Sequence, residues 1–110
     1  MAANGTGNIP SFTAVNTGVS PVTAIITVTA VYTNAGITCT GNSQSFTIVV
    51  NPTPTVNPVA NQVLCNGSNT AAVNFTGSVP GTIYNWTNNN TSIGLAAAGA
   101  GNIASFVATN

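Results

Sequence analysis

The most regular alternation of hydrophobic and polar positions lies in residues 22–33. Its threonines, Thr23, Thr27, Thr29 and Thr33, all stand at odd-numbered positions. The even-numbered positions are apolar or aromatic and hold Val22, Ala24, Ile26, Val28, Ala30 and Tyr32. A period of two carried by β-branched residues is typical of a half-buried strand. The pattern predicts a strand with one apolar and one hydroxyl face.

The rest of the first half carries weaker strand patterns between clusters of turn residues. These clusters are NTGVSP at 16–21, Asn34-Ala35-Gly36 and Gly41-Asn42-Ser43. We expect a meander of about four short strands, at 9–15, 22–33, 37–40 and 45–50.

A proline-rich stretch, NPTPTVNP at 51–58, divides the chain. Proline removes backbone donors and favours extended conformations, so we expect a linker there. Strand patterns resume at 62–65, 71–76, 82–87 and 103–107. About eight short strands with turns between them predict an all-β antiparallel sandwich.

The two ends of the chain carry the same sequence. Residues 1–16 and 95–110 align at an offset of 94 and are identical at ten of sixteen positions, including Ile9/Ile103 and Phe12/Phe106. Self-similarity at a fixed period indicates a repeat array, here with a unit the size of a small domain. On this period, 1–50 form the C-terminal half of one unit, and 59–110 form the N-terminal half of the next. Together they make about one sandwich domain.

Composition restricts the chemistry, because the chain contains no Lys, Arg, Asp, Glu or His. General acid–base catalysis relies mostly on these side chains, and protein metal sites need carboxylates, imidazoles or clustered thiolates. Nucleic acid binding needs cations that neutralise phosphates. We therefore expect no enzyme activity, no catalytic residue, no cofactor or metal, and no nucleic acid partner.

The chain should nevertheless fold, because 44% of its residues are hydrophobic, whereas disordered chains are poor in such residues. No apolar run approaches the roughly 18 residues of a membrane-spanning helix, so membrane insertion is not expected. The N-terminus lacks the pattern of a signal peptide. Any export signal is expected outside residues 1–110.

Cys39 and Cys65 are the only cysteines, and the proline-rich stretch separates them. Paired cysteines of exported β domains normally form disulfides. On the repeat period, however, they belong to different units. A disulfide within one chain, a disulfide between chains, and free thiols all stay open.

Aromatic residues are few, and a core needs most of them. We expect Trp86, Tyr32, Phe46 and Phe75 to be core anchors. The alternative for Trp86 is an exposed platform that stacks on a glycan.

The segments GNIPSFTAVN, PVTAIITVTAVYTNAGITCTG, SQSFTIVVNPTPTV, LCNG and YNWTN resemble the PKD-like, immunoglobulin-like repeats of very large bacterial cell-surface and secreted proteins, often exported by the type IX pathway. The resemblance covers almost the whole chain. It implies a sandwich of about seven or eight strands, a tandem arrangement, an extracellular location, and a role as stalk, adhesin or spacer. It brings no catalytic residues.

The register differs from that of a family unit, because the last part of the unit comes first in this chain. The strand at the cut is therefore present twice. Completion of the sandwich within one chain stays open, although a linker of about eight residues reaches at most about 28 Å, which is marginal for folding back. In the easier solution, the leading strands of one chain complete the trailing half of another, which gives a filament or a swapped dimer.

Three functions follow from these observations. The first is a non-catalytic structural or adhesive repeat whose partner is another copy of itself. The second is a carbohydrate-binding module. The third is a charge-free protein, selected or designed to fold without ionisable side chains.

Overall fold

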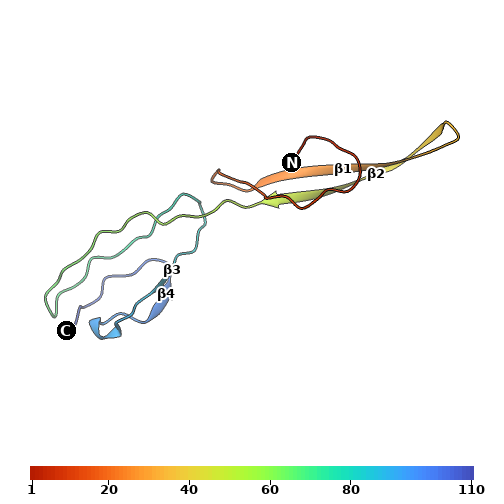
Figure 1. Ribbon diagram of the computed structural model, residues 1–110. Helices are drawn as coiled ribbons and strands as arrows, with labels where there is room; N and C mark the ends of the chain where they lie inside the picture. Colours follow the sequence, from red (N-terminus) through yellow and green to blue (C-terminus); the bar gives the residue numbers. More distant parts are fainter. The chain divides into compact units, whose positions relative to one another are not determined.

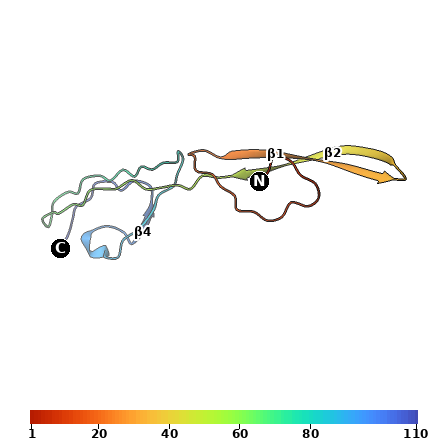
Figure 2. The ribbon, with the colours of Figure 1, turned by 45° about the horizontal axis from the view of Figure 1, so that its top comes forward.

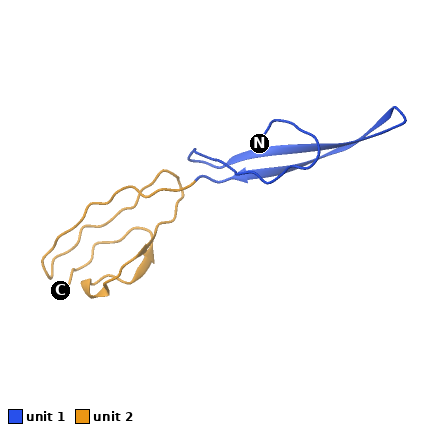
Figure 3. Cartoon of the chain, in the orientation of Figure 1, with its two compact units in different colours: residues 1–52 blue, residues 53–110 orange.

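The computed structural model describes all 110 residues, and almost all of its backbone is extended. Its regular elements are strands β1 (Val22–Asn34), β2 (Ile37–Val50), β3 (Asn85–Thr87) and β4 (Ala98–Ala100), and the short 3-10 helix η1 (Thr91–Ile93) (Figure 1). The chain divides into two compact units, 1–52 and 53–110 (Figure 3). The all-β expectation is confirmed. No helix has the length and apolar character needed to cross a membrane.

Unit 1 is dominated by a long antiparallel hairpin of β1 and β2, in which Val22 pairs with Val50 and Asn34 pairs with Ile37. The hairpin is closed by Ala35 and Gly36, which have φ angles of 49° and 78°. Positive φ at both loop positions is the mark of a type I′ turn, whose twist matches that of the flanking strands. The predicted turn at 34–36 is thus confirmed.

The hairpin contains one irregularity, where the sequence suggested a break. Thr29 pairs with Ser43, whereas Val31 pairs with Thr40, so two residues of β2 lie opposite Ala30 alone. This is a β-bulge, which inserts a residue without ending the strand. The expectation of two separate strands at 37–40 and 45–50 was wrong, because the long pairing with β1 outweighs the local turn preference of Gly41-Asn42-Ser43.

The first twenty residues of unit 1 form no strand. The expectation of a strand at 9–15 was therefore wrong for this structure. The segment loops beside the hairpin and reverses direction before β1 (Figures 1 and 2). The side-chain amide of Asn16 ties it down, because its Nδ2 donates to the carbonyl oxygens of Ser20 and Val50, each at 2.8 Å.

Three extended segments of unit 2 lie side by side, although most of their residues are not regular strands. The backbone N–H of Asn57 donates to the oxygen of Thr76 at 2.8 Å, which joins 53–62 to 71–78. Val73 and Ile103 exchange two backbone hydrogen bonds of 2.8 and 2.9 Å, which join 71–77 to 101–108. Residues 53–58 therefore belong to the second unit, and only 51 and 52 of the expected linker lie outside it.

The remaining part of unit 2 is the β3–β4 pair, with Trp86 opposite Gly99. η1 lies between these strands in sequence; the side chain of Asn90 caps its start, and Gly94, with φ of 100°, ends it. Gly101, with φ of 79°, reverses the chain after β4. After this reversal, residues 102–109 run parallel to β3 (Figure 1).

No residue of the chain is buried. Tyr32 and Phe46 are 70% and 45% exposed, so they do not anchor a core within one chain, contrary to expectation. Phe75 and Trp86 are half-buried. The physical reason is that the hairpin has only two strands and nothing covers its apolar face, and a two-stranded sheet cannot enclose a core.

Candidate interaction surfaces

The candidate site is a surface for burial and hydrogen bonding, because no side chain of the chain carries a charge near neutral pH. Such a surface can bind only through apolar contact, neutral hydrogen bonds and backbone pairing. Two surfaces of this kind are present, one on each unit. Each is described by itself.

The first surface is one face of the hairpin, which we call the hairpin apolar face. The pairing register places on it the even-numbered residues of β1 and their partners on β2. Its members are Val22, Ala24, Ile26, Val28, Ala30, Tyr32, Asn34, Ile37, Cys39, Gln44, Phe46, Ile48 and Val50. Only Ile26, Ile48 and Val50 are half-buried, and the rest are exposed. The alternation predicted for 22–33 is confirmed.

The opposite face of the hairpin carries a ladder of hydroxyl groups, together with the exposed apolar side chains of Ile25, Val31 and Val49. Thr27 and Ser45, Thr29 and Ser43, and Thr33 and Thr38 join their hydroxyl oxygens across the strands at 3.0, 2.6 and 2.8 Å. These groups satisfy one another and also remain accessible to water. The hairpin therefore has one face that is mainly hydroxyl and one that is almost entirely apolar.

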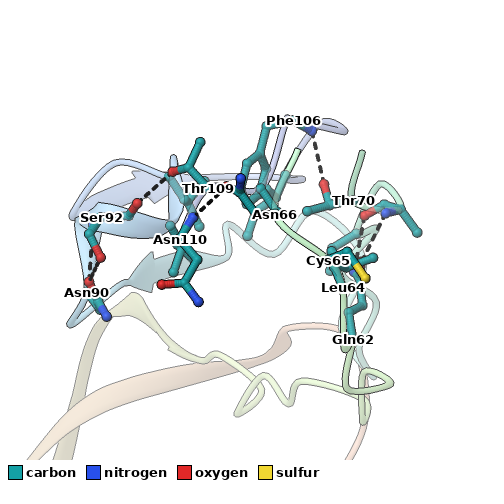
Figure 4. A pocket seen from close by; sticks show the side chains of 16 residues that line it. Gln62, Leu64, Cys65, Asn66, Thr70, Asn90, Ser92, Phe106, Thr109 and Asn110 are labelled. Carbon is teal, nitrogen blue, oxygen red and sulfur yellow. Dashed lines mark hydrogen bonds between the residues drawn. The ribbon is translucent and has the colours of Figure 1, made fainter. Parts of the chain in front are cut away.

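The second surface is a cleft of about 510 Å³ in unit 2, open to solvent (Figure 4). Its apolar lining comes from segments far apart in the sequence, namely Leu64, Val73, Ile93, Leu95, Ile103 and Phe106. Cys65 and polar residues such as Gln62, Asn66 and Asn110 also line it. The cleft is an open space between neighbouring segments, with a lining that is partly apolar and partly polar.

The polar groups around this cleft are largely paired with one another. Thr109 Oγ1 donates to the oxygen of Ser92 at 2.6 Å, and the backbone N–H of Asn110 donates to Asn66 Oδ1 at 2.9 Å (Figure 4). The Gln62 amide both donates to and accepts from the backbone of Ala71. These groups hold the rim in place and leave the apolar lining as the part available for contact.

A second hollow of about 260 Å³ lies beside β3 and is lined by Phe75, Tyr84 and Trp86 among others. The rings of Phe75 and Tyr84 pack with their centroids 5.9 Å apart. The indole of Trp86 lies against Gly99, and its Nε1 is shielded from solvent without a hydrogen-bond acceptor. A shielded donor without a partner is costly, because it has lost water and gained nothing in return.

One edge of β3 is unpaired. The backbone N–H of Asn88 donates to Ala97 and the oxygen of Tyr84 accepts from Gly101, so the even-numbered residues of this segment face β4. In an antiparallel ladder the alternate residues point the other way. Asn85 and Thr87 therefore direct their backbone groups to the opposite edge, where no strand lies.

Both cysteines are free and exposed, with Cys39 on β2 and Cys65 in the turn at 65–68. The disulfide is not formed here, and its pairing between chains stays a prediction. The two copies of the repeated strand differ: Ile103 and Phe106 are half-buried and paired with 70–73, whereas Ile9 and Phe12 are exposed.

Sequence reasoning did not identify the free edge of β3 or the close approach of Gly99 to Trp86. The alternation of Tyr84 and Trp86 indicated a strand, but a single strand carries no information about which of its edges is paired. Gly99 lies in a Gly- and Ala-rich stretch that gave no sign of a partner.

Comparison with known proteins identifies no relative: no family model, no curated protein and no solved structure matches this chain.

Proposed function

We propose that this chain is a non-catalytic structural or adhesive repeat of an extracellular surface protein, and that it associates with other copies of itself by strand complementation. The observation that carries the proposal is the hairpin apolar face. A long, amphipathic hairpin exposes Val28, Phe46 and Tyr32 on this face, whereas its other face carries mainly paired hydroxyl groups. An exposed apolar surface of this kind marks an interaction site.

Unit 2 offers the complementary surface. Its open cleft and the hollow beside Trp86 lack the apolar filling that close-packed domains have. Full burial of a large apolar side chain stabilises by about 1.5–3 kcal/mol. Covering several side chains on each surface therefore provides a driving force for association that needs no charged group.

The absence of charge favours the same behaviour. Lys, Glu and other charged residues on sheet edges normally oppose edge-to-edge pairing, and this chain has none. A net charge near zero also removes the repulsion between copies. Pairing of strand edges between copies then gives the unpaired backbone groups hydrogen-bond partners and removes apolar surface from water.

The proposal is tested by light scattering behind size exclusion over a range of concentrations, with negative-stain microscopy of the largest species. We expect a mass that rises above the 10.9 kDa of one chain as the concentration increases, and regular fibres or a discrete dimer. A species that stays at the mass of one chain at all concentrations, with cooperative unfolding, would contradict it.

A further inference from the structure

We propose that β1 of one copy pairs antiparallel with the free edge of β3 of a second copy, and that the hairpin apolar face then covers Trp86 and the cleft of unit 2. This inference rests on the proposed self-association and specifies its interface. Four observations support it: the sequence repeat, the strand directions, the unpaired backbone groups, and the short connection between the units.

The repeat indicates that a hairpin like β1–β2 belongs beside the segment 103–109 of unit 2. Residues 9–15 of unit 1 correspond to 103–109 of unit 2. In unit 1 this sequence is followed by a bend at 18–20 and then by the hairpin. The corresponding segment of unit 2, 103–109, borders the open cleft. A hairpin like β1–β2 is therefore the segment that follows the strand 103–109 in a complete unit.

The strand directions agree with an antiparallel pairing. Residues 102–109 run in the direction of β3, because Gly101 reverses the direction of β4 (Figures 1 and 2). In unit 1, β1 runs back against 9–15 (Figure 1). If a hairpin follows 103–109 with the same geometry, its first strand runs antiparallel to 103–109. It therefore also runs antiparallel to β3, as an antiparallel ladder requires.

The unpaired groups specify which edge receives the hairpin. Asn85 and Thr87 present backbone donors and acceptors on the edge of β3 that no strand covers. The shielded Nε1 of Trp86 lies on the same strand and needs an acceptor. An arriving strand satisfies the edge by main-chain hydrogen bonds, as in β-strand addition.

The short connection excludes pairing of the hairpin with β3 of its own chain. In the proposed ladder β2 runs parallel to β3, and segment 53–62 also runs parallel to β3 (Figure 1). If both belonged to one chain, β2 would end at the end of the unit opposite to the one where segment 53–62 begins. The connection would then have to span the length of that segment, roughly 30 Å at about 3.3 Å per residue. The three residue steps from Val50 to Thr53 reach at most about 11 Å. The pairing therefore joins two copies, with different surfaces on donor and acceptor, which is a head-to-tail interface.

The test uses two proline variants of the full chain. Thr87→Pro removes a donor on the free edge of β3, where proline is tolerated in the single chain because that N–H has no partner. Ala98→Pro is the matched control, because the N–H of Ala98 points to the outer edge of β4 in the same two-stranded sheet. We expect Thr87→Pro to remain a single chain at concentrations where wild type assembles, and Ala98→Pro to assemble within about twofold of wild type.

Residue-resolved hydrogen exchange of the wild-type assembly, dissolved under quench conditions, provides a second measurement. We expect the amides of Asn85 and Thr87 to be protected at least about tenfold by assembly, and those of Ala98 and Ala100 to be unchanged. Assembly of Thr87→Pro like wild type, or unprotected amides at 85 and 87, overturns the inference and leaves the proposed self-association standing. If both proline variants fail to assemble, exchange in the wild type decides. A wild type that never assembles overturns both proposals.

Discussion

Trp86 and Gly99 face each other across the β3–β4 pair, and the indole ring occupies the space that a side chain at position 99 would fill. The glycine is thus required by packing and not by its backbone, since its φ lies outside the positive region. This contact holds the ring of the only tryptophan against β4, in the same two-stranded sheet as the free edge of β3. It also makes the position of the indole a sensitive reporter of the surface that we propose as an interface.

The variant Gly99→Ala should displace the indole. An added Cβ would lie only 2.7 and 2.9 Å from two of the ring carbons and closer still to a third, and overpacking of this kind costs about 1–3 kcal/mol. We expect an altered tryptophan emission maximum and a weaker tendency to assemble. Gly5→Ala is the control, because a Cβ there meets no atom within 4 Å. Identical emission spectra of both variants would refute the packing argument.

The variant Gly77→Ala should separate segment 53–58 from segment 71–78. A Cβ at this position would collide with the backbone oxygen of Thr55, and backbone cannot move aside as a flexible side chain can. We expect faster hydrogen exchange of the Asn57 amide, which donates to Thr76 in this structure. If that amide exchanges at the wild-type rate, residues 53–58 behave as a linker after all. Gly5→Ala again serves as the control.

Substitutions on the two faces of β1 should have opposite outcomes. Val28→Asn places a polar amide on the hairpin apolar face and removes apolar contact worth about 1.4 kcal/mol, so we expect the critical concentration for assembly to rise about tenfold. Thr27→Asn changes the neighbouring residue on the hydroxyl face and should alter it by less than about threefold. Light scattering against concentration gives both values. Equal effects would show that the apolar face is not the contact surface.

Stability should hardly depend on pH between about 3 and 8. The side chains with reference pKa values in this range are those of Asp, Glu and His, and the chain has none of them. No side chain then takes up or releases protons differently in the folded and unfolded states there, so the linkage slope is close to zero. Denaturant midpoints at pH 3, 5 and 7 should agree, and they should also agree at low and high salt. A steep loss of stability on acidification would be incompatible with this account.

Deletion of residues 1–15 should preserve assembly. The strand 103–109 already occupies its place in unit 2, where it pairs with 70–73, whereas its counterpart 9–15 forms no strand. The deletion leaves Asn16 and its hydrogen bonds to Ser20 and Val50 intact. We expect a critical concentration within about threefold of the full chain, measured by sedimentation. Loss of assembly would instead mean that the N-terminal copy exchanges with 103–109 between chains.

Several features followed from local pattern alone. The strand over 22–33, its apolar and hydroxyl faces and the turn at 34–36 were all readable, because alternation with a period of two and positive-φ turn residues act over a few neighbouring positions. The exclusion of charge-based chemistry followed from composition. The expectation that the leading strands of one chain complete the trailing half of another came from the repeat.

The remaining features depend on which segments meet, and the repeated strand shows this most directly. Ile9 and Phe12 stand in nearly the same local sequence as Ile103 and Phe106, yet only the second copy is paired. Its partner, 70–73, is held in turn by the two hydrogen bonds between Ala71 and the Gln62 side chain, whereas 9–15 pairs with no strand. Likewise, Gly41-Asn42-Ser43 became a bulge because β1 continued to pair beyond it. The sequence by itself determined which residues prefer extended backbone and which face of each strand is apolar. Only the tertiary structure decided which of those strands obtained partners, because backbone hydrogen bonds and apolar burial between distant segments are not encoded in the pattern of either segment alone.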